Sequence, residues 1–223
     1  MDLKLFGQAL AKFLLGAVLV GVLIFLPAGT LRYPQGWLLM LLLFVPMFLA
    51  GLVMMARSPE LLRKRLQARE QENEQKQVVA LSGLLFLVCF VLAGLNFRFG
   101  WLPLPRSVVF ASAGLFVLAY LLYAEVLREN AYLSRTIEVQ ENQRVIDTGL
   151  YGIVRHPMYA VTVLLFLSMP LVLGSLLSFA AMLFYLPLIV RRILGEEAVL
   201  EQGLEGYADY KKRVKYRLLP GVW

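Results

Sequence analysis

Two groups of polar residues in the second half of the chain have the types and spacing that a binding site needs. The first is Arg155-His156-Pro157, with Tyr159 two residues further on. Proline is tolerated in the first turn of a helix, so a helix is predicted to begin at Pro157. The free N–H groups and partial positive charge of a helix N-terminus suit a carboxylate. Taken alone, however, this pattern is more typical of a helix cap with an aromatic anchor at a membrane surface.

The second group is formed by Arg192 and Glu196, which are four residues apart. On a helix these two residues share a face and can pair. An ion pair at the membrane surface explains the spacing as well as a site does. Tyr207 and Tyr210 follow, and then the basic run 211–213, which favours contact with anionic lipids.

The elements that position these residues are predicted to be membrane-spanning helices. Apolar residues make up 60% of the 223 residues and charged residues 17%, whereas soluble domains have about half and a quarter. This composition excludes a disordered chain, a disulfide scaffold and an ordinary cytosolic enzyme. The net charge of +7 comes from basic residues beside apolar runs, which favours lipid headgroups over nucleic acid.

About 20 apolar residues span a bilayer as a helix. Four such runs are predicted in the first half of the chain, at about 6–26, 37–56, 78–95 and 108–126. Pro27 and Gly29 are expected to end the first of them. The apolar stretch 158–190 is too long for one span, and Pro170, Gly174 and Ser175 are expected to divide it into a hairpin of two short helices. We therefore predict an all-α polytopic membrane protein with about six transmembrane helices.

The charged residues predict the orientation of these spans. Six spans place both termini, the loop 57–77 and the loop 127–157 on one side of the membrane. That side receives 19 of the 22 basic residues and all 15 acidic residues. By the positive-inside rule it is cytoplasmic, so both termini and the polar groups are predicted to be cytoplasmic. Within the loop 57–77, Ser58-Pro59-Glu60 predicts the start of an amphipathic helix on the membrane surface.

Four motifs follow one another in the second half of the chain: Asp147-Thr148-Gly149-x-Tyr151, Pro157-x-Tyr159, Glu196-Glu197-x-x-Leu200 and Tyr207-x-x-Tyr210-Lys211-Lys212-Arg213-Val214. Together they resemble the isoprenylcysteine carboxyl methyltransferases. They are also similar to the wider integral membrane methyltransferases, including phospholipid N-methyltransferases. The resemblance extends from about Gln140 to Pro220, roughly a third of the chain. The chain contains neither a GxGxxG nor a Walker A pattern, so a Rossmann nucleotide domain is not expected.

The resemblance implies that S-adenosyl-L-methionine binds at the cytoplasmic end of the hairpin. By motif position, the residues implied to contact this donor are Gln140, Gln143, Arg144, Val145, Ile146, Tyr151, His156, Pro157, Met158, Tyr159 and Glu196. Arg192 falls where the family has an arginine assigned to the acceptor carboxylate. Glu197 is either a further site residue or simply an acid on the helix surface. No metal site is expected.

The resemblance also divides the chain in two. Residues 1–127 would hold four transmembrane helices and the amphipathic segment near 57–77, and residues 128–223 would form the cofactor-binding region with its hairpin and tail. One departure from the family concerns Val161, where a glycine is usual. A glycine would permit a close approach, so valine narrows the acceptor pocket.

The function implied is methylation of a lipophilic small-molecule or lipidated acceptor that enters from the membrane lipids. An acceptor carboxylate is already ionised at neutral pH, so the enzyme needs to align the reacting atoms and needs no general base. The alternatives are a phospholipid N-methyltransferase, which requires a base, and an NADPH-dependent sterol-type reductase, because such reductases share an Arg-His-x-x-Tyr feature. A lipid-binding or scaffold protein is the alternative without catalysis.

Overall fold

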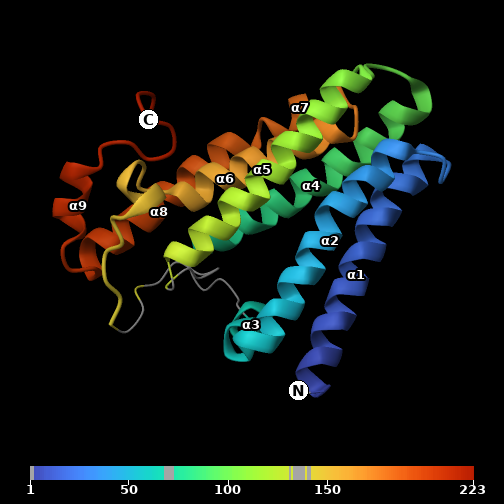
Figure 1. Ribbon diagram of the computed structural model, residues 1–223. Coiled ribbons are helices and arrows are strands. Elements are labelled where there is room, and N and C mark those ends of the chain that lie inside the picture. Colours follow the sequence, from blue (N-terminus) through green and yellow to red (C-terminus); the bar gives the residue numbers. More distant parts are fainter. Residues whose placement is uncertain (1–2, 68–72, 131, 133–138, 140–141) are drawn as a thin grey trace.

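The computed structural model of the protein describes residues 3–67, 73–130, 132, 139 and 142–223, and the regular elements within these ranges are all helices. Four long helices come first, α1 (Leu3–Ala28), α2 (Pro34–Arg57), α4 (Asn73–Phe99) and α5 (Arg106–Glu129), with the short α3 (Pro59–Gln67) between α2 and α4. The second half contains η1 (Gly149–Gly152), α6 (Pro157–Val172), α7 (Leu176–Met182), α8 (Tyr185–Gly203) and α9 (Tyr207–Arg213). Figure 1 shows α4, α5, α6 and α8 as one slanted bundle, with the α1–α2 hairpin leaning against one end of it.

Five helical segments are long and apolar enough to cross a membrane, namely 3–28, 34–57, 76–99, 106–129 and 176–203. The helix α6 is shorter but also apolar. The prediction of an all-helical polytopic membrane protein with about six membrane helices is therefore confirmed. The predicted start of the surface helix is also confirmed, because α3 begins at Pro59.

The predicted ends of the helices agree with the structure to within a few residues, and the prolines account for the differences. The helix α1 runs through Pro27 to Ala28, and α6 runs through Pro170 to Val172. A proline near the end of a helix removes one hydrogen bond without stopping the last turn. A further break, which was not predicted, lies at residues 183–184, between α7 and α8. Pro187 cannot donate to the carbonyl four residues back, at Leu183, so α8 begins afresh with Pro187 in its first turn.

The turn between α6 and α7 lies where Gly174 and Ser175 predict it. Gly174 has a positive φ of 71°, which glycine adopts at low cost. The Ser175 side chain caps α7 by accepting from the Ser178 backbone N–H at 3.2 Å. The second arm of the predicted hairpin therefore consists of two consecutive helices, α7 and α8. The helix α8 continues past residue 190, where the apolar stretch ends, to Gly203.

The bundle is held together by close helix contacts near the short loops. The helix α1 packs against α4, and α5 packs along α6. A Cβ added to Gly94 on α4 would lie 2.5 Å from the Ile24 carbonyl oxygen of α1. Small residues of this kind let membrane helices approach closely. The Tyr33 hydroxyl, in the α1–α2 loop, donates to the Leu173 carbonyl at 2.5 Å and ties this loop to the end of α6.

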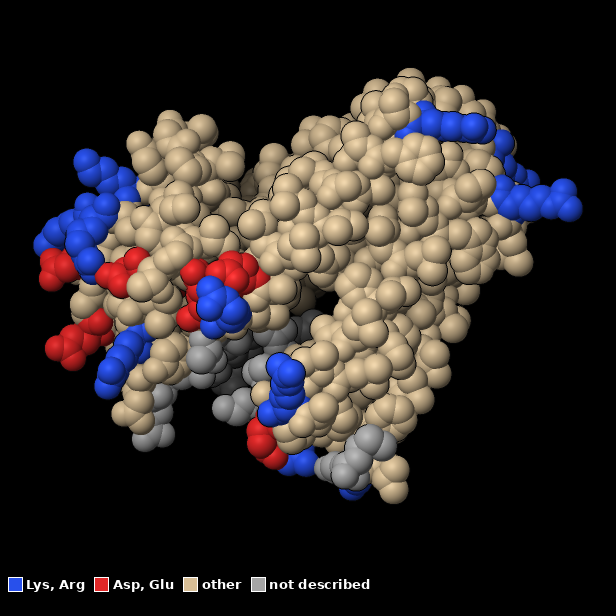
Figure 2. All heavy atoms as spheres, in the orientation of Figure 1, with Lys and Arg blue, Asp and Glu red and all other residues tan. Residues whose placement is uncertain are grey.

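Charged side chains gather at the two ends of the molecule and leave an uncharged belt between them, as the face in Figure 2 shows. On that face the acidic side chains lie only toward the end that carries α3, α8 and α9, while the opposite end carries basic side chains alone. The fold therefore delivers the ends of α5 and α8, together with α9, to the same polar end.

Candidate functional site

The segment that leads into α6 is fixed by a glycine and a carboxylate. Gly149 has a φ of +51°, and Glu129 at the end of α5 accepts from the Leu150 backbone N–H at 3.0 Å. A Cβ on Gly149 would overlap the Glu129 carboxylate, with its Oε1 only 1.3 Å away. The left-handed φ and the Glu129 contact both favour glycine here, and η1, which begins at this glycine, places Tyr151 in the protein interior.

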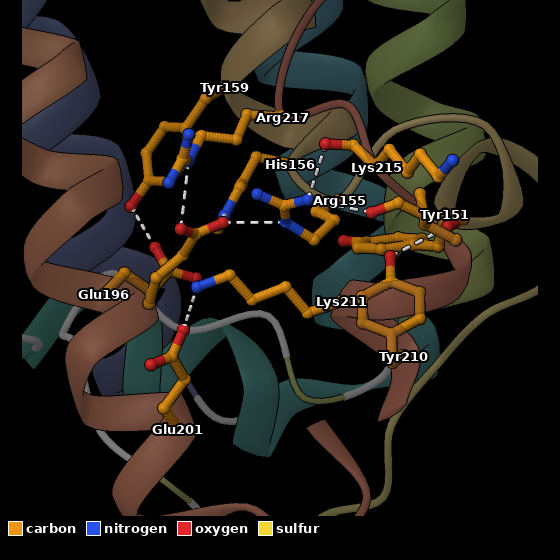
Figure 3. A network of polar contacts seen from close by, with 12 residues as sticks. Tyr151, Arg155, His156, Tyr159, Glu196, Glu201, Tyr210, Lys211, Lys215 and Arg217 are labelled. Carbon is orange, nitrogen blue, oxygen red and sulfur yellow. Dashed lines mark hydrogen bonds and ion pairs between the residues drawn. The ribbon is translucent and has the colours of Figure 1, made fainter. Parts of the chain in front are cut away.

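The C-terminal tail pairs with the residues just before α6. The backbone N–H groups of Arg155 and His156 donate to the Tyr216 and Arg217 carbonyls, both at 2.9 Å. The Arg155 Nη1 also donates to the Val214 carbonyl at 2.8 Å. Figure 3 shows the side chains of Arg155, His156 and Arg217 pointing toward one another. The helix begins at Pro157 with His156 as its cap residue, as predicted.

Glu197 lies at the centre of a buried ionic network. Its Oε1 accepts from the Arg155 Nε at 2.8 Å and lies 3.2 Å from the His156 Nε2, while its Oε2 accepts from the Arg217 Nε at 2.9 Å. Only 3% of Glu197 is exposed. The interpretation of Glu197 as a helix-surface acid was therefore wrong. A buried carboxylate is stable only when it is paired and hydrogen-bonded. The segment just before α6 and the C-terminal tail supply these partners to Glu197 on α8.

Glu196, the adjacent residue, points to a different environment. The Tyr159 hydroxyl donates a short hydrogen bond to the Glu196 carboxylate and accepts from the Arg192 Nε at 3.1 Å. This hydroxyl thus links Arg192 and Glu196, the two residues whose spacing predicted a shared helix face. The resulting chain of three polar side chains lies on the wall of a pocket between α6 and α8.

Tyrosines form the opposite wall of this pocket. The Tyr210 hydroxyl donates to the Tyr151 carbonyl at 2.7 Å, and the Asn130 amide donates to the Tyr151 hydroxyl at 3.0 Å. Burial raises the pKa of Tyr151 to about 12, so this side chain is a neutral phenol at physiological pH. Burial likewise raises the pKa of Tyr207.

Tyr207 also has an unused hydrogen-bonding group. Its side chain is 3% exposed, and its hydroxyl has no hydrogen-bond partner within the described part of the chain. Unsatisfied buried hydroxyls are rare, since each loses the hydrogen bonds that water would supply. Because Tyr207 lines the pocket, a polar group of a ligand is the natural partner for it.

The structure brings most of the predicted site residues to this one pocket. Those that line it are Gln143, Arg144, Val145, Ile146, Tyr151, His156, Met158, Tyr159, Arg192 and Glu196. Pro157 is buried as the first residue of α6 and is not among the lining residues. Gln140 lies outside the described residues. The roles of all these residues remain predictions.

Seven further residues line the pocket that sequence reasoning had not assigned to it: Asn130, Tyr132, Arg155, Leu200, Leu204, Tyr207 and Tyr210. Helical spacing could have predicted Leu200 as a lining residue, because positions 192, 196 and 200 follow one face of α8. The Tyr-x-x-Tyr motif contains the signal for the two tyrosines. Asn130 has no comparable signal, since it reaches the pocket only through the packing of α5 on α6.

Val161 was expected to narrow the space near the site. It is buried in a cluster with Ala119, Val126 and Tyr151, where α5 packs on α6. The valine side chain therefore fills the interface between these two helices beneath Tyr151, and it is not among the residues that line the pocket.

Comparison with known proteins points to a membrane enzyme. Residues 107–205 match the family model described as phospholipid methyltransferase. The mouse (Mus musculus) Delta(14)-sterol reductase TM7SF2 is 32% identical over 91 residues, which are 40% of this chain and 22% of the reductase. The chain thus matches only about a fifth of that relative's length. Over residues 107–205 the chain is similar to phospholipid methyltransferases, and the similarity does not identify isoprenylcysteine as an acceptor.

Proposed function

We propose that the protein is an S-adenosylmethionine-dependent integral membrane methyltransferase acting on the carboxylate of a lipophilic, isoprenylcysteine-like acceptor. The observation that carries this proposal is the Arg192–Tyr159–Glu196 chain on the wall of a pocket at the polar ends of α6 and α8. We also propose that residues 128–223 form the cofactor-binding region and that residues 1–127 anchor it in the membrane.

The lining residues suit the chemical groups of the donor. Glu196 can accept hydrogen bonds from ribose hydroxyls or from the α-ammonium group. The buried tyrosines offer flat faces to an adenine ring, and the unpartnered Tyr207 hydroxyl needs a polar partner. When bound, the donor supplies a methyl group on a positively charged sulfur. These features support the donor assignment without the metal ligands or Gly-rich loop that other cofactors require.

The pocket must widen to admit this donor. Its free space is about 100 Å³, well below the 300–1,000 Å³ typical of small-molecule sites. The wall formed by residues 143–146 belongs to neither a helix nor a strand. We expect this wall to move outward, because it can do so without breaking helical hydrogen bonds.

The acceptor chemistry follows from Arg192. A guanidinium can hold a carboxylate by two parallel hydrogen bonds, which orients one carboxylate oxygen toward the donor. That oxygen forms the new C–O bond as the C–S bond breaks. No proton needs to move, because the carboxylate is already ionised at neutral pH. The buried side chains of Tyr151, His156 and Tyr159 would exclude water from the reacting atoms.

Phospholipid N-methylation is the second candidate, and the family match favours it. An amine acceptor must lose a proton before or during methyl transfer. Glu196, with Tyr159 hydrogen-bonded to it, is the carboxylate in the pocket that could receive this proton. The two candidates share the donor site and differ in what Arg192 and Glu196 do.

Donor binding tests the proposal. S-adenosylhomocysteine should raise the melting temperature of the detergent-solubilised protein, and NADPH should not. A response to NADPH alone would overturn the proposal in favour of a reductase. This third class is suggested by the 91-residue similarity to the sterol reductase.

Substitution of two neighbouring arginines tests whether donor binding and acceptor binding depend on different residues. Arg192→Gln should leave S-adenosylhomocysteine affinity within about twofold but lower methyl transfer to a prenylated cysteine acceptor by about 10²-fold, the effect of losing a charged orienting contact. Arg191→Gln is the matched control, because Arg191 is the exposed preceding residue on α8. If phosphatidylethanolamine is methylated and the prenylated acceptor is not, the acceptor assignment passes to the second candidate.

A further inference from the structure

A second cavity lies away from the donor pocket, among α1, α2, α3 and Tyr123 of α5. Its volume is about 510 Å³, within the 300–1,000 Å³ typical of small-molecule sites. In Figure 1 the halves of α1 and α2 nearest the N-terminus stand away from the rest of the bundle, and α3 lies at their foot. None of the residues that line this cavity lines the donor pocket.

The wall of the cavity is apolar and adaptable. Along α2 it runs from Met47 to Met55, which is about 12 Å at 1.5 Å per residue. Methionine side chains are flexible and fit apolar ligands of variable shape. Gly51 lies in the middle of this wall, and a Cβ added there would meet no heavy atom within 4 Å. The cavity is therefore an open slot of the length and chemistry that a hydrocarbon chain requires.

One lysine stands on the wall of this apolar slot. Lys12 belongs to α1, between the lining residues Leu10 and Phe13, and its ammonium donates to the Leu66 carbonyl of α3 at 2.7 Å. An ammonium has three N–H donors, and no acidic residue is among the described residues that line the cavity. Lys12 is exposed, and a lysine near a membrane surface attracts anionic lipid headgroups. The chemistry of the slot thus calls for an anionic oxygen beside Lys12.

The depth of Lys12 in the membrane follows from α3. Leu62 of α3 is buried, whereas Glu60 and Arg63 on the same helix pair with each other at 3.0 Å near its exposed face. Such an amphipathic helix lies at the boundary between headgroups and acyl chains. Because Lys12 contacts the end of α3, its ammonium lies at the level of lipid phosphates, and the slot extends from there toward the centre of the bilayer.

We propose that this cavity binds one anionic phospholipid, with its phosphate at Lys12 and an acyl chain along Met47–Met55. The net negative charge of an anionic headgroup strengthens its attraction to Lys12 relative to a zwitterionic headgroup, and the apolar slot holds the chain. The lipid bound here does not need to accept a methyl group, so the site is separate from the proposed reaction.

Photo-crosslinking tests this site without any methyl donor, so its outcome is independent of the proposed function. The protein is reconstituted in phosphatidylcholine vesicles that contain a trace of phosphatidic acid with a diazirine in one acyl chain. After illumination, adducts should concentrate on the α2 peptide containing Met47–Met55. Lys12→Gln should lower this adduct about fivefold, the contribution of one lysine near an anionic lipid, and Lys12→Arg should retain it.

Two glycines provide a matched steric control. Gly51→Phe fills the slot and should abolish the α2 adduct. Gly83→Phe places the same side chain on α4, where a Cβ also meets no heavy atom within 4 Å, and should leave the adduct unchanged. Adducts spread evenly over α2, α4 and α5 in the wild-type protein would show ordinary surrounding lipid and overturn the proposal. An adduct that is insensitive to both Gly51→Phe and Lys12→Gln would overturn it as well.

Discussion

At the scale of single residues, two adjacent carboxylates on α8 have different tasks. Glu197 is enclosed by Arg155, His156 and Arg217, whereas Glu196 meets Tyr159 on the pocket wall. Consecutive helix positions point about 100° apart, so one faces the packed tail while the other faces the pocket. We infer that Glu197 assembles the site and that Glu196 serves the ligand.

Removing Glu197 should therefore destabilise the protein. Glu197→Ala leaves the buried Arg155 and the partly exposed Arg217 without their carboxylate, and breaking a buried pair typically costs about 3–5 kcal/mol. Glu201→Ala on the same helix removes an exposed pair with Lys211 and should cost at most about 1 kcal/mol. Thermal unfolding in detergent measures both. Equal melting temperatures for the two variants would contradict a structural role for Glu197.

Two tyrosines of α9 should respond in opposite ways to loss of the hydroxyl. Tyr207→Phe removes a hydroxyl without a partner, so the melting temperature should stay the same or rise, while S-adenosylhomocysteine affinity falls about fivefold. Tyr210→Phe breaks a buried hydrogen bond to the Tyr151 carbonyl and should lower stability by about 1 kcal/mol. Calorimetry measures the stability of both variants, and ligand titration measures their affinity for S-adenosylhomocysteine. An unchanged affinity for Tyr207→Phe would remove this residue from the donor site.

The sequence predicted the residues of the pocket wall better than it predicted their partners. Arg192 and Glu196 follow helical spacing, and Pro157 marks a helix start, so local rules suffice for them. Glu197 depends on Arg217, which arrives from a tail 20 residues further along. Asn130 reaches Tyr151 only because α5 packs on α6. Contacts between distant segments carry no periodic signal in a single sequence.

At the scale of helices, apolar run length predicted the spans, and proline alone did not predict their ends. Pro27 and Pro170 lie inside helices, whereas Pro187 marks the restart of a helix after a break. The carbonyl of Pro170 accepts from the Ser175 backbone N–H at 3.0 Å, so the turn that follows this proline still closes with a hydrogen bond. This contact forms only in the folded turn and is invisible in composition.

The contact between α1 and α4 should depend on Gly94. A methyl group at this position would lie within 3.0 Å of both the Ile24 carbonyl oxygen and the Ala28 nitrogen. Gly94→Ala should therefore push α1 away and lower stability by about 1–3 kcal/mol, the usual cost of overpacking. Gly83→Ala on the same helix faces open space and should be neutral or slightly stabilising. Equal unfolding curves for both variants would show that the close approach is unimportant.

At the scale of the whole molecule, the charge asymmetry predicts its orientation in the membrane. Ser58 and Ser107 are exposed serines at opposite ends of the spans, and the native Cys89 is buried. In intact cells, a membrane-impermeant maleimide should label Ser107→Cys and should label Ser58→Cys only after the cells are opened. The native protein is the background control. Labelling in the reverse order would place the donor pocket outside the cytoplasm.

The pairing between the tail and the segment before α6 has a consequence for how the protein matures. The Arg155 side chain and its backbone partners are separated by 59–60 residues, and the whole α6–α8 hairpin lies between them. The two halves of the pocket wall can meet only after that hairpin has entered the bilayer and returned. If the hairpin is inserted wrongly, the two halves of the pocket wall remain on opposite sides of the membrane or far apart. Under the proposed function, binding of the methyl donor would therefore report that the hairpin has inserted completely.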